Sequence, residues 1–397
     1  GNSVPLVRIF QLFTLLKNIA AHEVVPPRGR WLNLDMRTLD WDGKLISVDQ
    51  LRRPYDALMR DIEQIVKKRI FRGKPIPADL SPDFFRDKSF TDPLANNTLD
   101  FCGIDHPDNR FTEHAGDYLR WLLSHPDLVA EFTIPTDDGF EFRASAVAEL
   151  MEAFDELTQK LAVAMYFAGP CLFRGTELAD LHLRNTRDAF LRNFQFILGS
   201  PALVLFLDKT SLHRLDTRLI PVLPPSLLAR YLLQLLVFFR PAQVYFAKIF
   251  LAKTEPGAAY RFRTALWPQI KGNLDSEQIS RQMANLTLAQ FGIGLRIVAW
   301  RKLCAFVLKS LAKLPESASV APLVDRMSSH SRRTARRHYD QDAGLPSGVD
   351  YEEVNASALL CRQWHCITGI DRGEPLKFES LNGTPSERQR PDHQRCR

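Results

Sequence analysis

Apolar residues recur at helical spacing along much of this chain. The strongest pattern covers 144–168 and predicts a long, buried helix. Residues 4–22 follow the same spacing, and residues 47–71 predict a second long helix. Ser47 is a candidate N-cap for that helix, but Pro54 lies inside it and favours a start nearer to the proline.

The remaining helical patterns are shorter and lie mostly in the second half of the chain. Two helices are expected within 275–313, separated near Gly292 and Gly294. Further helices are predicted at 113–124, 225–239 and 355–367. Two segments lack a helical period and are predicted as loops, namely 25–46 and the connector 73–110, which is rich in Pro, Asp and Asn.

The period changes from helical to strand-like near residue 194. Residues 194–198 and 202–207 are rich in strand-forming residues, and Gly199-Ser200 between them predicts a hairpin. Residues 218–222 predict a third strand. A short three-stranded sheet among many helices indicates a mostly helical α+β fold rather than a doubly wound one.

The length of 397 residues is enough for two or three domains. The patterns predict a mostly helical N-terminal domain (1–140), a mixed domain (141–345), a C-terminal helix (346–369) and a polar tail expected to be disordered (370–397). Charged residues interrupt the apolar run 227–251 at Arg230, Arg240 and Lys248. We therefore predict a buried helix there, and no membrane association.

The charge balance and the cysteines narrow the partners and the chemistry. A net charge of +6 mildly favours a polyanionic partner. The six cysteines are scattered and form no CxxC pair, which fits a reducing compartment and predicts no metal site. Cys361, His365 and Cys366 lie close in sequence, but ordinary helix packing explains them better than a metal does.

Five polar residues in the second half form the candidate chemical set: Arg174, Lys209, Arg301, His330 and Tyr339. Singly, each has an ordinary explanation. Arg174 can pair with Glu177 one helical turn away, and Arg301 can extend from an apolar helix to water. Together and in this order, they point to one site.

This order resembles the tyrosine recombinase family, also called tyrosine integrases. Arg174 and Glu177 match the Arg-x-x-Glu-Leu motif, Lys209 the lysine after the hairpin, and Arg301 the second arginine. His330 and Tyr339 match the last histidine and the nucleophile nine residues later. The strings Arg-Gly-Thr-Glu-Leu and His-Ser-Arg-Arg-Thr-Ala-Arg-Arg-His-Tyr are similar to fungal Crypton-type recombinases, over roughly residues 110–369.

The resemblance implies cleavage and rejoining of double-stranded DNA in the nucleus, by a dimer or tetramer and without a cofactor. Residues 141–345 then form the catalytic domain, and residues 1–140 a DNA-clamping domain. Tyr339 attacks the phosphodiester and forms a 3′-phosphotyrosyl link, while Lys209 protonates the leaving oxygen. Two arginines suit this chemistry because each gives paired donors to the charged phosphorane.

Two residues depart from the family pattern. Val298 stands where most members have histidine, three residues before Arg301, and Ser329 replaces the glycine before His330. Crypton-like members often lack the first histidine. Its loss leaves open a second hypothesis, a DNA-binding module on a recombinase fold without catalysis. A third is a regulatory domain of a larger fungal protein.

Two basic clusters are candidate phosphate contacts. The first is Arg332, Arg333, Arg336 and Arg337, directly before Tyr339, and the second includes Arg184 and Arg192, near the hairpin. The alternative for the first cluster is a solvated helix face. We also expect the helix at 355–367 to dock on a neighbouring protomer, as such helices often do in this family.

Overall fold

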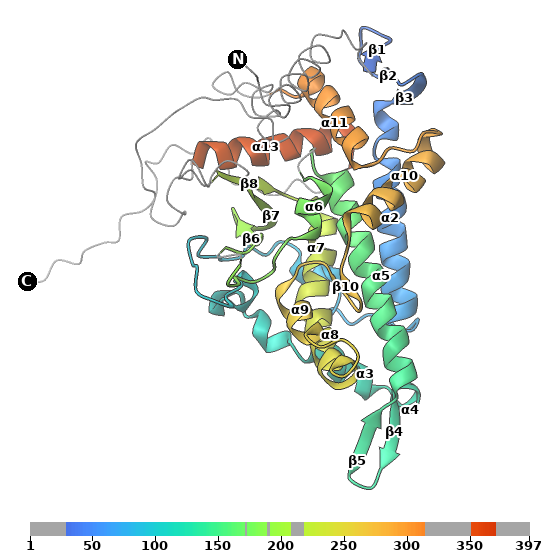
Figure 1. Ribbon diagram of the computed structural model, residues 1–397, viewed down its shortest axis with the longest axis vertical. Coiled ribbons are helices and arrows are strands. Elements are labelled where there is room, and N and C mark those ends of the chain that lie inside the picture. The colour runs from blue at the N-terminus through green and yellow to red at the C-terminus, as the bar shows by residue number, and fades with distance from the viewer. Residues whose placement is uncertain (1–28, 171–172, 189–190, 208–217, 314–350, 371–397) are drawn as a thin grey trace, which may run out of the picture.

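The computed structural model describes residues 29–170, 173–188, 191–207, 218–313 and 351–370. These residues form a mostly helical α+β fold with several small antiparallel sheets (Figure 1), and the predicted fold class is confirmed at that level. The helix predicted at 4–22, and all but the first residue of the tail expected to be disordered (370–397), lie outside the described residues.

Helix α5 (Ala144–Ala168) is the centre of the fold, and it covers the whole predicted span. Most of its residues are buried, because other helices pack around it on several sides (Figure 1). One of them is α2 (Arg53–Gln64), which has Pro54 in its first turn and continues as a wider helix, η2 (Ile65–Ile70). The start predicted near Pro54 is therefore correct, and the helix start at Ser47 is wrong.

Residues 29–47 form a three-stranded antiparallel sheet, so the loop predicted for 25–46 is wrong in its described part. The strands are β1 (Gly29–Trp31), β2 (Thr38–Trp41) and β3 (Lys44–Ser47), followed by the short helix η1 (Val48–Gln50). Asp42 and Gly43 both have positive φ and close a two-residue turn, the conformation that an Asp-Gly pair favours. The glycines and prolines had indicated a loop, but Leu39, Trp41 and Ile46 are buried.

The connector between the two large helices has little regular structure, as predicted for 73–110. It contains three short 3₁₀ helices, η3 (Pro82–Phe85), η4 (Gly103–Asp105) and η5 (Pro107–Asn109), and a fourth, η6 (Phe111–His114), follows it directly. The helix predicted at 113–124 begins later, as α3 (Asp117–Ser124). Helix α4 (Pro126–Phe132) and a hairpin of β4 (Thr133–Thr136) and β5 (Gly139–Phe142) then lead into α5.

The predicted three-stranded sheet is confirmed. It consists of β6 (Phe194–Ile197), β7 (Ser200–Leu207) and β8 (Arg218–Val222), in that order and antiparallel. The β6–β7 turn is Leu198-Gly199, one residue earlier than the Gly199-Ser200 pair that we expected, and both residues have positive φ. Glycine is required at 199 also because a Cβ there would overlap Ser89.

One long helical segment follows the sheet, and it extends beyond the predicted end at 239. It comprises α7 (Ser226–Gln234), η8 (Leu235–Phe239), α8 (Arg240–Phe246) and η9 (Ala247–Leu251). Among the described residues this segment alone is long and apolar enough to span a membrane. However, 72% of its most apolar 18-residue stretch is buried inside the protein, which is typical of a core helix.

A short helix, a pair of short strands and two longer helices complete this part of the chain. Helix α9 (Ala258–Thr264) and the pair β9 (Pro268–Gln269) and β10 (Gly272–Asn273) lead to α10 (Ser276–Phe291) and α11 (Ile297–Leu311). Both of these helices were predicted. Gly292, in the left-handed region with φ of 72°, ends α10 where the split was expected.

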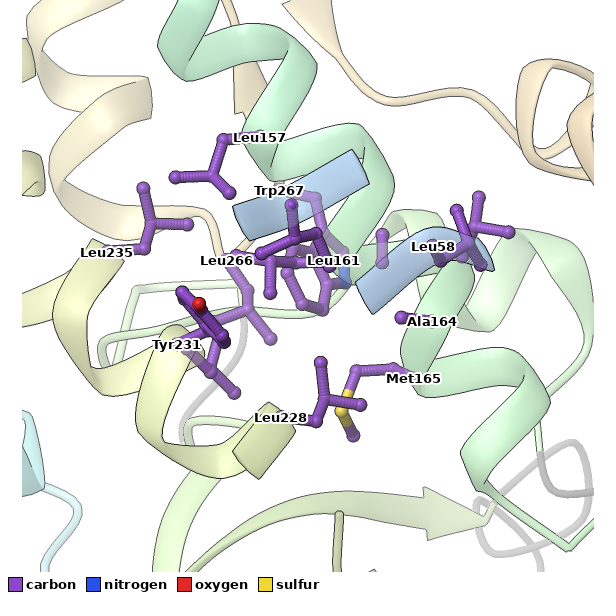
Figure 2. Packing of buried hydrophobic residues seen from close by; sticks show 14 of the residues in the cluster. Leu58, Leu157, Leu161, Ala164, Met165, Leu228, Tyr231, Leu235, Leu266 and Trp267 are labelled. Atoms are coloured by element: carbon purple, nitrogen blue, oxygen red, sulfur yellow. The ribbon is translucent and has the colours of Figure 1, made fainter. Parts of the chain in front are cut away.

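A single large cluster of buried residues extends across the predicted domain boundary at residue 140. Leu58 from α2 belongs to the same cluster as Leu161 and Met165 of α5, Tyr231 of α7 and Trp267 (Figure 2). Aromatic contacts continue this packing, because the Phe71 ring lies 5.9 Å from that of Phe239. The boundary at 140 therefore does not divide the hydrophobic core, and it falls inside the β4–β5 hairpin.

The C-terminal helix α13 (Tyr351–Thr368) packs on its own chain. Trp364 is fully buried and donates from Nε1 to the carbonyl of Phe167 at 3.1 Å, and its ring lies against Trp300 of α11. His365 lies 3.0 Å from the Ala168 carbonyl, and burial lowers its pKa to about 4. Within one chain the helix therefore packs on α5 and α11, and its docking on a neighbouring protomer stays a prediction.

The same packing argues against the metal alternative at this helix. Cys361 is buried, Cys366 is exposed, and the side chain of His365 is engaged by a backbone carbonyl. No group of three or more His, Cys, Asp or Glu side chains within the described ranges is arranged to hold a metal ion.

Candidate functional site

Arg174 lies directly before the short helix α6 (Gly175–Ala179), with extended backbone. Its backbone N–H donates to Glu177 Oε2 at 2.7 Å, and its Nε lies 3.5 Å from Glu177 Oε1. Glu177 thus satisfies a backbone donor at the helix start and also orients the arginine. The Arg174 side chain remains 38% exposed, so its guanidinium can still reach a bound anion.

The residue after Arg174 brings three helices together. A Cβ added to Gly175 would lie 2.9 Å from Ile297 Cδ1 and 2.9 Å from Ser276 Cβ. The first residues of α10 and α11 therefore pack against the start of α6, and only glycine fits between them. This contact explains in physical terms why glycine follows the first arginine of the motif.

Arg301 lies on α11, one helical turn after Ile297. Its side chain is half-buried, whereas Ile297, Trp300 and Cys304 on the same helix are buried. The contact at Gly175 places the beginning of this helix beside Arg174. The structure thus brings together the elements that carry the two predicted arginines.

Val298 is 62% exposed, although it is a branched apolar residue. It precedes Arg301 by three residues, so the two side chains lie on one side of α11. A histidine here, as in the tyrosine recombinases that the sequence resembles, would be at an exposed position too. Packing does not explain a valine here, because the side chain contributes little to the core.

The other predicted catalytic residues lie outside the described residues. Lys209 comes two residues after the end of β7 at Leu207, and His330 and Tyr339 fall in 314–350. The basic cluster Arg332, Arg333, Arg336 and Arg337 falls in the same segment. Their arrangement relative to Arg174 therefore stays a prediction.

Arg192 requires a correction, because it has a structural role. Its side chain is fully buried and forms an ion pair with the equally buried Asp92. It also donates to the Asn96 carbonyl at 3.1 Å, and its guanidinium lies 4.6 Å from the Phe101 ring centre. A phosphate cannot reach this group, so Arg192 is not a DNA contact in this structure.

Arg184 is paired in a similar way. Both terminal nitrogens donate to Asp105, and Nη1 also donates to the Asp100 carbonyl at 2.9 Å. Only 15% of its side chain is exposed. Arg184 and Arg192 therefore join the connector 73–110 to the segment that precedes β6, a role that sequence reasoning missed. The available signal was the high content of aspartate in the connector, which supplies three partners for arginine.

Asp155, on α5, is a carboxylate in a largely buried setting that the sequence did not single out. Its Oδ2 accepts from the Ile270 N–H at 2.7 Å and so holds the turn between β9 and β10. Burial raises its pKa to about 7, and this hydrogen bond together with Arg240 and Arg261 only partly offsets the rise. Its ionisation in the folded protein therefore costs stability.

Asp155 should lower the free energy of unfolding as the pH rises from about 4 through about 7, because the unfolded chain releases this proton more readily than the folded one. Asp155→Asn keeps an oxygen that can accept from Ile270 but cannot ionise. The variant should be more stable than wild type at pH 8, by on the order of 2 kcal/mol, and similar below pH 4. Urea unfolding at several pH values measures this. Glu152→Gln, at an exposed position on the same helix, is the control, and equal pH slopes for wild type and Asp155→Asn would contradict the account.

Comparison of the chain with protein-family models, with curated proteins and with solved structures gives no match.

Proposed function

We propose that this protein cleaves and rejoins DNA strands through a covalent 3′-phosphotyrosyl intermediate, as a tyrosine recombinase of the Crypton type. The observation that carries the proposal is the order and spacing of Arg174, Lys209, Arg301, His330 and Tyr339. One structural observation also supports it: the segments that carry Arg174 and Arg301 pack against each other at Gly175.

In this mechanism the arginines bind the non-bridging oxygens of the scissile phosphate. Arg174 suits that role because it is accessible and oriented by Glu177, without being neutralised by a short, bidentate pair. Preorganised donors of this kind stabilise a charged transition state more than they stabilise the substrate. Lys209 protonates the 5′-oxygen that leaves as Tyr339 attacks.

The phosphotyrosyl link conserves the energy of the broken phosphodiester. A second DNA 5′-hydroxyl can therefore attack it and restore a phosphodiester, while Tyr339 recovers its proton. No nucleotide or metal is needed for this exchange. Double-stranded DNA and a second copy of the chain are the partners that the proposal requires, in the nucleus.

One observation favours a second candidate function, a DNA-binding module without catalysis. Val298 exposes an apolar side chain at the position where the family histidine would act. The two candidates are separated by incubating the protein with a nicked duplex that prevents rejoining. An adduct that survives denaturation supports the recombinase, and salt-sensitive binding without an adduct supports the module.

A further inference from the structure

The β4–β5 hairpin projects beyond the body of the protein at the end of α5 (Figure 1). Its residues Ile134 and Phe140 are large apolar side chains that are 45% and 49% exposed. Nothing in the proposed DNA chemistry uses this hairpin, and it lies far along the chain from Tyr339.

The register of the hairpin shows which edge can accept another strand. Arg143 N–H donates to the Phe132 carbonyl, so alternate pairs along the ladder are hydrogen-bonded and Pro135 faces Phe140 in a non-hydrogen-bonded pair. The N–H and C=O groups of Phe140 and Phe142 therefore point away from β4. Within the described residues they have no partner outside the hairpin.

The opposite edge is closed. On β4 the outward position 135 is proline, which has no N–H to donate. The Thr133 carbonyl on that edge accepts from Arg143 Nη2 at 3.4 Å. Proline and covering side chains are how proteins protect strand edges from pairing, and here they protect β4 but not β5.

An apolar row lies beside the open edge. The rings of Phe140 and Phe142 are 5.6 Å apart, and the ring of Phe142 is 6.0 Å from that of Tyr245 on α8. Tyr245 is 42% exposed. A strand that pairs with the open edge of β5 would place every second side chain over these three rings.

The negative charge of the hairpin favours a basic partner. Asp137, Asp138 and Glu141 are exposed and have no ion pair among the described residues, and residues 133–142 contain no lysine or arginine. A phosphate backbone would be repelled by them. A second copy of the hairpin would bring two sets of the same carboxylates together, which is also unfavourable.

We propose that the β4–β5 hairpin binds a basic, extended segment of a partner protein, which pairs with β5 as a third strand. Main-chain hydrogen bonds to Phe140 and Phe142 give the pairing, the aromatic row receives alternate apolar side chains, and the carboxylates receive the lysines or arginines between them.

The test is binding of two labelled peptides to the full chain, followed by fluorescence anisotropy. One peptide alternates lysine with valine, and the other alternates glutamate with valine. We expect the lysine peptide to bind and the glutamate peptide not to bind. Replacing both Asp137 and Asp138 with asparagine should weaken the lysine peptide several-fold and reduce its salt dependence.

Phe140→Pro removes one outward N–H that the hairpin itself does not use, and should weaken the lysine peptide at least about tenfold. Phe140→Ala keeps that N–H and separates the contribution of the ring. Pro135→Ala, on the closed edge, is the matched control and should not weaken binding. Urea unfolding checks that the variants stay folded.

Three results would overturn the proposal. They are no binding of the lysine peptide, equal binding of the two peptides, and equal binding by wild type and Phe140→Pro. A dimer in sedimentation that Phe140→Pro makes monomeric would assign the edge to a second copy instead. All of these readouts are independent of strand cleavage.

Discussion

Replacing Arg174 with alanine is expected to slow DNA strand cleavage by about 10²–10³-fold, the usual cost of losing one preorganised donor to a developing oxyanion. The free energy of unfolding should change by less than about 1 kcal/mol, because the side chain is partly exposed and its contact with Glu177 is 3.5 Å long. The rate of adduct formation on a nicked duplex measures the first quantity, and urea unfolding the second.

Two variants make this result specific. Arg174→Lys keeps the charge but loses the paired, planar donors, so its rate should lie between those of wild type and the alanine variant. Arg296→Ala removes another arginine at the start of α11, one that pairs with Glu277 at 3.1 Å and is 61% exposed. If Arg296→Ala slows cleavage as much as Arg174→Ala does, the effect is general electrostatics and not a role for Arg174.

Replacing Trp364 with alanine is expected to lower the free energy of unfolding by about 3–5 kcal/mol. The ring is fully buried between α11 and α5, and its N–H donates to the Phe167 carbonyl, so truncation leaves both a cavity and an unpaired acceptor. Cys366→Ala, on the exposed side of the same helix, should change stability by less than about 0.5 kcal/mol.

The same experiment separates packing within one chain from docking on a neighbour. With α13 packed on its own chain, the urea midpoint of wild type should not depend on protein concentration. A midpoint that rises with concentration would mean that folding is linked to association, and it would support docking of this helix on a neighbour.

Helical periodicity and runs of strand-forming residues were sufficient to predict the long helices and the larger sheet. Helix α5, helices α10 and α11 and the three strands β6–β8 lie where their patterns indicated. The sheet β1–β3 was missed because its strands are only three or four residues long, too short for a reliable alternation. The Asp42-Gly43 turn was the better signal.

The arginines show what sequence cannot supply. Arg174 and Arg192 are equally basic in the sequence, yet one is partly exposed and the other is fully buried against Asp92. That difference arises from the connector, which brings Asp92 to the hairpin across a separation of 100 residues. No local pattern contains such a pairing, and only the folded chain distinguishes a phosphate contact from a structural ion pair.

The most direct test of the central claim is covalent trapping with wild type and Tyr339→Phe. Each protein is incubated with the nicked duplex and then denatured, and labelled DNA that migrates with protein is measured. We predict an adduct with wild type, none with Tyr339→Phe, and equal duplex binding by both, because the hydroxyl is needed for attack and not for binding. An adduct that persists in Tyr339→Phe, or no adduct with wild type despite tight binding, would contradict the proposal.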